Sequence, residues 1–327
     1  MTTLTNLNDI AMKAGVNIST VSRALRGSHE IKSETRNRIS KIASELEYNI
    51  NKPKKNMSEI ENNNIGVICP EVRSTFYGQL VNTIEENLKA EGYHLIFGLT
   101  NFKFENELYY LDLFLKRRVA GIIFITSLDK RIEEELEMFK AKCDIPLIQV
   151  NTEIRNESYD YIEIDDYKGV SLAVDHLIEL GHSKICYLGD IISNMRIKSF
   201  KDTLRKNSIE VDEDLIRVGE ERFEEGGYLR MNEVLSLNKP VTAVFASYDD
   251  VAVGAMRAIY EKGLKIPEDI SIIGVDNVRV TGYLYNKLTT ISEPVDELGI
   301  IATKILIGKI EDKSNKIIQH VKLIPEL

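Results

Sequence analysis

The residues best suited to chemistry form a short segment near the amino terminus, Asn17–Gly27, where small polar side chains and arginine alternate with apolar ones. On a helix, Val21, Ala24 and Leu25 would face inward. Four residues of the first turns would face outward: Ile18, Ser19, Ser22 and Arg23. Short side chains let a backbone approach a DNA groove, and arginine is the side chain that most often reads guanine there. The segment therefore predicts a helix that reads bases in the major groove.

Two further helical patterns position this segment. Apolar residues repeat at i, i+3, i+4 and i+7 before it and again behind it: Leu7, Ile10, Ala11 and Ala14, then Ile39, Ile42, Ala43 and Leu46. Gly15 suits the positive φ of a tight turn, and Asn17 can cap the next helix. We therefore predict a helix-turn-helix head with a third helix that ends near Tyr48. The alternative is a three-helix packing unit without DNA, which leaves the lack of Glu–Lys pairs on the outward face unexplained.

The charge of the chain is divided unevenly. The 327 residues carry a net charge of −9, yet residues 1–60 hold ten Lys and Arg against six Asp and Glu, a net +4, and the remainder is net −13. A basic head on an acidic body suits a protein that meets phosphates at one end only. The length predicts two or three domains, and an apolar content of 43% permits sizeable cores.

Several kinds of site and protein are not expected. The three cysteines, Cys69, Cys143 and Cys186, form no CxxC or Cys/His cluster, so we predict buried thiols and neither a metal nor a cofactor. Residues 1–6 lack the basic start and apolar core of a signal peptide, and the sequence has no 18-residue apolar run. We therefore expect a cytoplasmic protein. The sequence has no GxxxxGK[ST] phosphate loop, and no Ser/His/Asp arrangement can be singled out.

A polar stretch without apolar periodicity follows the head at residues 49–64. This composition predicts a linker. The linker is either a passive tether or a short hinge helix that Pro53 opens as its first residue, with Lys54 and Lys55 drawn to phosphate.

Beyond the linker the sequence pattern changes, and short apolar runs alternate with amphipathic helices. Strands are predicted at 65–69, 93–99, 119–125, 146–150, 185–188, 215–218, 242–246 and 270–275, and helices at 79–91, 105–116, 132–142, 168–180, 196–206, 227–235 and 250–262. Near-continuous apolar strands between helices indicate parallel sheets covered on both faces. The number of residues between positions 65 and 119 is nearly the same as that between positions 185 and 241, as a repeated block of strands and helices would give. This repeat predicts two similar lobes with a cleft at the carboxyl ends of their strands.

Four groups of residues form a pattern that spans the chain in order. They are Asp9-Ile10-Ala11 with Ala14-Gly15-Val16, Thr20-Val21-Ser22-Arg23, Thr35-Arg36 and Leu46-Glu47-Tyr48-Asn49; Asp165-Asp166 with Gly169, His176-Leu177 and Leu180-Gly181-His182; Asp249-Asp250 with Gly254-Ala255-Met256; and Ile266–Gly274 with Asp276 and Leu288–Ile291. With this pattern the whole chain resembles the lac repressor/GalR family of bacterial transcription regulators. The set is far more specific than one helix-turn-helix.

The resemblance implies a fold and a division into domains. It implies an N-terminal three-helix helix-turn-helix head plus an α/β body with two parallel-sheet lobes like a type I periplasmic binding protein. The implied domains are residues 1–48 for DNA binding, 49–64 as a hinge or linker, and 65–327 as an effector-binding and dimerisation core. Within the core, the first lobe takes about 65–163 and 292–318, and the second takes about 164–291 and 319–327.

The resemblance also implies roles for residues of the head and hinge. Ile18 and Ser19 match the family's specificity-setting pair, and Arg23 matches its shared base reader. Three hydroxyl residues match positions that contact the DNA backbone: Thr20, Ser22 and Thr35. Met57 stands where the family usually places a leucine wedge in the minor groove. Lys54 stands where the family usually has alanine, so we expect a weaker hinge helix.

Six residues of the body match effector-pocket positions: Phe76, Tyr77, Arg196, Phe223, Tyr248 and Asp276. Arg196 and Asp276 match the polar pair that grips effector hydroxyls, and the aromatic residues match pocket walls. Phe223 matches its position only if a one-residue gap is introduced in the match to the family pattern; without the gap, Arg222 takes that position. Tyr248 stands where the family often has an asparagine. Without the family pattern, Arg196 would be interpreted as a surface ion-pair residue and Asp276 as a turn former.

We therefore expect a dimeric transcription regulator, a repressor, that binds a pseudo-palindromic double-stranded DNA operator. A small molecule between the lobes would control it. The pocket residues suit a sugar or sugar derivative, and a nucleobase or an anionic metabolite fits almost as well. The effector either releases DNA or promotes binding. No membrane partner is expected. The alternative function is an enzyme, such as a sugar kinase, with a DNA-binding head.

Overall fold

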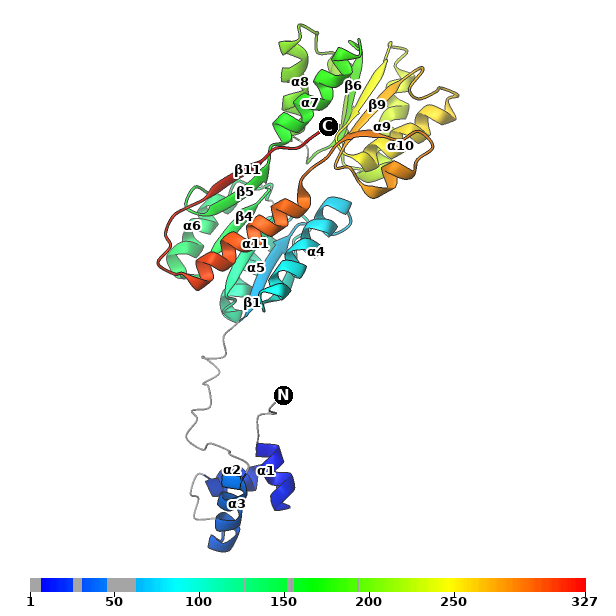
Figure 1. Cartoon of the computed structure of the whole chain (residues 1–327). Coiled ribbons are helices and arrows are strands. Elements are labelled where there is room, and N and C mark those ends of the chain that lie inside the picture. Colours follow the sequence, from blue (N-terminus) through cyan, green and yellow to red (C-terminus); the bar gives the residue numbers. More distant parts are fainter. Residues whose placement is uncertain are drawn as a thin grey trace. The chain divides into compact units, whose positions relative to one another are not determined.

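The computed structural model describes residues 7–25, 31–45, 63–125, 127–151, 154, 156–192 and 194–327. The chain divides into two compact units, residues 1–62 and residues 63–327. We call the first the head and the second the body; Figure 1 shows the body as two α/β lobes. In the described part of the chain, no helix is long and apolar enough to cross a membrane.

The described residues of the head form three short helices: α1 Leu7–Ala14, α2 Ile18–Leu25 and α3 Ser33–Glu45. Ile10, Val21 and Ile39 are fully buried where the helices meet, because the apolar stripe of each helix is covered by the other two. Gly15, at the turn between α1 and α2, has a φ of +64°, which glycine adopts at little cost. The predicted helix-turn-helix is therefore confirmed.

Part of the sequence interpretation lies outside the described residues. It includes the predicted end of the third helix near Tyr48 and the hinge with Pro53, Lys54 and Met57. Asn64, which the prediction placed at the end of the linker, instead begins the first strand of the body.

The first lobe is a six-stranded parallel sheet in the order β11-β5-β4-β3-β1-β2. Its strands are β1 Asn64–Cys69, β2 His94–Leu99, β3 Gly121–Ile125, β4 Leu147–Val150, β5 Asp160–Ile164 and β11 His320–Leu323. Its helices are α4 Thr75–Ala90, α5 Phe104–Arg117, α6 Ile132–Lys142 and α11 Val295–Glu311. Helices α4 and α11 share one hydrophobic cluster with the sheet, and α5 and α6 share the other. Both faces of the sheet are therefore covered, as the apolar strands predicted.

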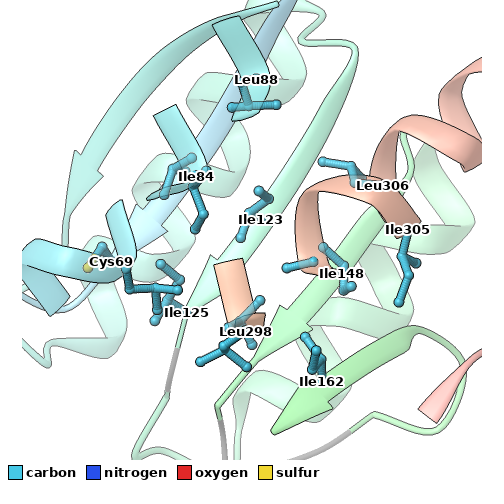
Figure 2. Packing of buried hydrophobic residues seen from close by; sticks show 14 of the residues in the cluster. Cys69, Ile84, Leu88, Ile123, Ile125, Ile148, Ile162, Leu298, Ile305 and Leu306 are labelled. Carbon is cyan, nitrogen blue, oxygen red and sulfur yellow. The ribbon is translucent and has the colours of Figure 1, made fainter. Parts of the chain in front are cut away.

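Figure 2 shows the larger of these clusters from close by, where side chains of α4, β3, β4 and α11 converge. Ile84, Ile123, Ile148 and Leu306 are all buried there. Burying one such side chain contributes about 1.5–3 kcal/mol. The core therefore fixes the sheet and, with it, the loops at its carboxyl edge.

The second lobe is a five-stranded parallel sheet in the order β10-β9-β8-β6-β7. Its strands are β6 Ile185–Asp190, β7 Ile216–Gly219, β8 Ala243–Ala246, β9 Ser271–Val275 and β10 Thr289–Ile291. Its helices are α7 Asp166–Glu179, α8 Asn194–Lys206, α9 Phe223–Ser236 and α10 Asp249–Glu261, with two short 3-10 turns at Glu213–Leu215 and Arg279–Tyr283. The two predicted lobes are thus confirmed.

The end of the chain corrects the predicted lobe boundary. Residues 319–327 were assigned to the second lobe, but β11 pairs with β5 in the first sheet, from His320 opposite Tyr161 to Leu323 opposite Ile164. The physical reason is the open edge of β5, whose backbone groups β11 satisfies. The chain then turns back, because Pro325 lies against Gly169 of α7. In the described body the chain thus passes between the lobes after β5, after β10 and after β11.

Helices α9 and α10 pack so closely that one glycine leaves no room for a side chain. A Cβ at Gly254 would lie 1.9 Å from the carbonyl oxygen of Glu224. Gly254→Ala should therefore lower the free energy of unfolding by about 1–3 kcal/mol. Gly308 on α11 has nothing within 4 Å of such a Cβ, so Gly308→Ala should be neutral or stabilising by up to about 1 kcal/mol. Urea unfolding measures both, and equal midpoints for the two variants would contradict this packing.

Candidate functional site

A cavity of about 130 Å³ lies between the two lobes of the body. Most of its lining follows the carboxyl end of a strand: Ser74, Phe76 and Tyr77 after β1; Ser127 and Leu128 after β3; Asn151 after β4; Asp190 and Ile192 at the end of β6; Arg222 after β7; Tyr248 after β8; and Asp276 after β9. Asp166 of α7 and Arg196 of α8 complete it. Parallel α/β sheets bind ligands at this edge, so the cavity is the candidate ligand site.

The start of α4 forms an aromatic wall of the cavity. Ser74 caps the helix, and its hydroxyl accepts a hydrogen bond from the Tyr77 N–H at 3.3 Å. The cap places Phe76 and Tyr77 edge to face, with ring centroids 5.2 Å apart. Phe102 supports the other side of Tyr77 at 6.3 Å. The wall is therefore a rigid apolar surface with one phenol group.

Arg196 is the central cation of the opposite wall. Its Nε donates to Asp166 Oδ1 at 2.9 Å, and its Nη2 lies 2.8 Å from Glu293 Oε1. Its Nη1 donates to the Ser247 carbonyl oxygen and lies 3.8 Å from Asp276 Oδ1. Burial acts to lower the pKa of Arg196, but the surrounding carboxylates outweigh that effect and keep the guanidinium charged.

Asp276 adopts a costly backbone conformation beside this cation. Its φ is +106°, outside the region that a residue with a Cβ normally adopts, at a cost of about 1–3 kcal/mol. Its N–H donates to the Ile291 carbonyl oxygen at 2.9 Å, which holds it between β9 and β10. Burial, followed by the charge of Glu293, raises the pKa of Asp276 well above its usual range, against the pull of Arg196. Strain of this kind gathers at functional sites.

A second polar cluster lies around Arg222. Its Nε donates to Asp190 Oδ2 at 3.0 Å, and its Nη1 donates to Glu71 Oε1 at 2.9 Å. Since Glu71 follows β1 and Arg222 follows β7, this ion pair joins the two lobes across the cavity. Tyr248 donates its hydroxyl hydrogen to Asp190 Oδ2 at 2.8 Å and accepts from the Phe223 N–H at 3.1 Å. Burial raises the pKa of Tyr248, so the phenol stays protonated.

The structure brings five of the six predicted pocket residues to the cavity: Phe76, Tyr77, Arg196, Tyr248 and Asp276. Phe223 does not line it. Arg222 does, and it is the residue that takes this position when no gap is introduced. The ring of Phe223 instead packs under the Arg222 guanidinium, 4.6 Å away, and beside Tyr248.

Several site residues were missed by sequence reasoning. Asp166 stands in a motif that carried the family resemblance but received no role. Asp190 ends β6, two residues beyond the predicted strand, and a charged residue at that edge was an available signal. Glu71 and Glu293 gave no local signal, because their arginine partners are 151 and 97 positions away.

A buried carboxyl supports the cavity from behind. Glu107 on α5 is only 2% exposed and accepts a hydrogen bond from the hydroxyl of Ser127, a lining residue, at 3.0 Å. Burial raises the pKa of Glu107 to about 7. Burial likewise raises the pKa of Asp249, which accepts from Thr290 and from the Val278 N–H, to about 7. Burial thus raises the pKa of two carboxyls that lie behind the lining residues.

In the head, the candidate DNA-reading residues share one helix. Ile18, Ser19, Thr20, Ser22 and Arg23 all lie on α2, with Arg23 exposed and Thr20 half-buried. In a further helix, α3, Thr35 is half-buried in the first turn. The amino end of α2 thus carries the pattern of short polar residues that a helix needs to approach a groove.

Comparison with known proteins gives matches over the whole chain. Residues 6–51 match the family "Bacterial regulatory proteins, lacI family", and residues 174–327 match "Periplasmic binding protein-like domain". The chain is similar to the HTH-type transcriptional regulator DegA of Bacillus subtilis (strain 168), with 31% identity over 99% of this chain and 96% of DegA.

Two solved structures are also similar. One is a LacI family transcriptional regulator from Enterococcus faecium with bound ribose, at 30% identity and a TM-score of 0.70, covering 80% of this chain and 96% of that one. The other is the lac repressor dimer bound to operator and an anti-inducer, at a TM-score of 0.76, covering 99% of this chain and 97% of that one. At 23% identity this second likeness concerns the fold alone.

Glu107→Gln should make the protein more stable than the wild type as pH rises. The folded pKa of about 7 lies above the ordinary 4.5, so this stabilisation is complete below about pH 4.5 and is lost as pH rises through 7. Between pH 5 and pH 8, the unfolding free energy should shift in favour of E107Q by about 2–3 kcal/mol relative to wild type.

Urea unfolding at several pH values measures this difference. Glu85→Gln, an exposed position on α4, is the matched control and should follow the wild type. Parallel pH curves for E107Q and the wild type would contradict the buried, proton-holding carboxyl.

Proposed function

The chain belongs to the lacI family of bacterial regulatory proteins, and we propose that it is a repressor whose affinity for an operator is set by a small-molecule effector, a sugar or sugar derivative, bound between the lobes. It is a DNA-binding transcriptional regulator, as its relatives are, and not an enzyme. The enzyme alternative raised by the sequence is therefore set aside.

One observation carries the effector part of the proposal. At the carboxyl edge of the second sheet, Arg196 and a strained Asp276 face the cavity, and the aromatic wall of Phe76 and Tyr77 lies on the other side. A buried arginine and aspartate can donate and accept several hydrogen bonds at fixed positions, and ring faces cover the apolar side of a small ligand. The Enterococcus faecium regulator with bound ribose supports the sugar class.

In the head, helix α2 is proposed to enter the major groove. Arg23 reads a base through its guanidinium, and Ile18 and Ser19 set the remaining preference. Thr20, Ser22 and Thr35 hold the backbone phosphates. Met57 in the hinge takes the minor-groove position of the family's leucine wedge.

We propose that residues 1–48 bind DNA, that residues 49–64 form the hinge, and that residues 65–327 form the effector-binding and dimerisation core. Two heads in a homodimer would meet two half-sites of a pseudo-palindromic operator. The lac repressor dimer on its operator supports this assembly. A bacterial regulator that binds chromosomal DNA acts in the cytoplasm, and we propose that location.

Arg196 links the cavity to the passages of the chain between the lobes. Its partner Asp166 begins α7, directly after the chain leaves the first lobe, and its partner Glu293 lies where the chain returns to that lobe before α11. An effector that contacts Arg196 or Asp276 therefore touches a network anchored at two of the three passages between the lobes. An effector that binds one arrangement of the lobes more tightly than the other shifts the populations of the two arrangements, and the operator affinity changes with them.

Arg23→Ala should weaken specific operator binding about 5- to 150-fold and leave non-specific binding almost unchanged. The reason is that a bidentate arginine–guanine contact discriminates by about 1–3 kcal/mol. Fluorescence anisotropy with operator and scrambled DNA measures both affinities. Arg38→Ala, an exposed arginine on α3, is the control. The recognition-helix assignment fails if R23A keeps the wild-type ratio of the two affinities.

Asp276→Asn should weaken the effector response about 5- to 150-fold, while operator affinity without effector is retained. The amide offers a ligand one acceptor oxygen in place of two, and a buried ligand donor left without its partner costs about 1–3 kcal/mol. A thermal-shift screen of sugars and nucleosides on the wild type identifies the ligand, and its midpoint is then measured in operator titrations. Asp202→Asn on α8 is the control. A wild-type midpoint for D276N would require a different pocket assignment.

A further inference from the structure

The walls of the cavity carry more negative than positive charge. In the part of the chain that the structure describes, three aspartates line the cavity: Asp166, Asp190 and Asp276. Two glutamates, Glu71 and Glu293, contact the lining arginines from behind. Five carboxyl groups thus surround two guanidinium groups. The exposed Arg73 lies over the Phe223 ring and is not part of the lining.

The charge of Arg196 is already engaged by the protein. Its Nε and Nη2 contact Asp166, its Nη2 also contacts Glu293, and its Nη1 donates to the Ser247 carbonyl oxygen. Its side chain is only 14% exposed. An anionic ligand would have to displace one of these partners, and the displaced carboxylate would then be buried without its cation.

Arg222 is engaged in the same way. It donates to Asp190 in its own lobe and to Glu71 in the other. The guanidinium also lies 5.3 Å from the Phe102 ring and 4.6 Å from the Phe223 ring. A phosphate that drew Arg222 away from Glu71 would break the ion pair that joins the lobes. The positive charge of Arg222 is therefore already compensated by two carboxylates of the protein.

Protonation does not remove the excess of negative charge. Burial raises the pKa of both Asp276 and Glu293. With these two counted as neutral, three carboxyl groups remain beside two guanidinium groups: Asp166, Asp190 and Glu71. A phosphate monoester carries a charge of about −1.5 to −2 at pH 7. One unit of that charge about 6 Å from an unpaired negative charge already loses about 100-fold in affinity at an effective dielectric constant of about 20.

The remaining lining groups suit hydroxyls. Ser74 and Ser127 carry hydroxyl groups, Asn151 carries an amide, and Asp276 accepts. Each hydroxyl of a ligand both donates and accepts one or more hydrogen bonds, so it can satisfy acceptors and donors in alternation without bringing charge. The cavity volume of about 130 Å³ limits the ligand to a compact molecule.

Building on the proposed effector role of this cavity, we propose that it selects an uncharged, hydroxyl-rich molecule of about monosaccharide size and rejects the phosphorylated form of the same molecule. Arg222, held by Glu71 and Asp190, is the residue that sets this selection. The pocket thus distinguishes a free sugar from a sugar phosphate by charge.

Matched ligand pairs test the proposal on the full-length protein. Isothermal titration calorimetry is run with D-ribose and ribose 5-phosphate, D-glucose and glucose 6-phosphate, and adenosine and adenosine 5′-monophosphate. At least one neutral member should bind, and its phosphorylated partner should bind about 100-fold more weakly or not at all. A phosphorylated member that binds as tightly as its neutral partner, or more tightly, would overturn the inference.

Operator titrations with the same ligands separate this inference from the proposed function. If a phosphorylated member binds and changes operator affinity, the charge selection is wrong and the effector role stands. If no member binds although the protein binds its operator, both the charge selection and the sugar-effector role are wrong.

A charge variant tests the role of Arg222. Glu71→Gln removes one carboxylate and one partner of Arg222, so the affinity ratio of a neutral ligand to its phosphate should fall at least tenfold. Glu85→Gln removes an exposed carboxylate on α4 and should leave the ratio unchanged. An unchanged ratio in E71Q, in a protein that still binds the neutral ligand, would show that Arg222 does not set the selection.

Discussion

The interaction on which the body depends is the burial of the Arg196 guanidinium among carboxylates from separate parts of the chain. Asp166 begins α7, Asp276 follows β9, and Glu293 precedes α11. Removing one partner of such a buried network typically costs about 3–5 kcal/mol, because the remaining charge is left uncompensated. The network therefore requires the strand ends and the chain passages after β5 and β10 to lie where they do. It also places a cation and a strained acceptor at the cavity wall, so in the proposed function stability and ligand recognition use the same contacts.

The same geometry explains how a small ligand can act at a distance. The lobes are joined by passages after β5, β10 and β11 and, across the cavity, by the ion pair of Arg222 with Glu71. A ligand that adds contacts to both walls favours one lobe arrangement over another by the difference in its affinity for the two. In a family whose members carry a DNA-binding head, that difference becomes a difference in operator affinity, with a coupling free energy of typically about 1–3 kcal/mol.

The sequence predicts most of the fold because the strands of a doubly covered sheet are continuous apolar runs. The predicted strand 270–275 and helix 132–142 agree closely with β9 and α6. Strand β5 was missed because Asp160 and Glu163 interrupt its apolar pattern. Both are buried, and each is paired through tertiary contacts, with Lys309 at 3.4 Å and Lys322 at 3.3 Å. For the site, the family pattern located the cavity residues Arg196 and Asp276. Their partners lie far away in the sequence and could be identified only in the folded chain.

The central claim is that ligand and operator bind one protein whose two sites are coupled. The most direct test is to measure the dissociation constant of the neutral ligand with and without saturating operator, and that of the operator with and without saturating ligand. The account predicts that each partner changes the affinity for the other by the same factor, about 5–150-fold. A ligand that binds in the cavity with the same affinity in both conditions would contradict it.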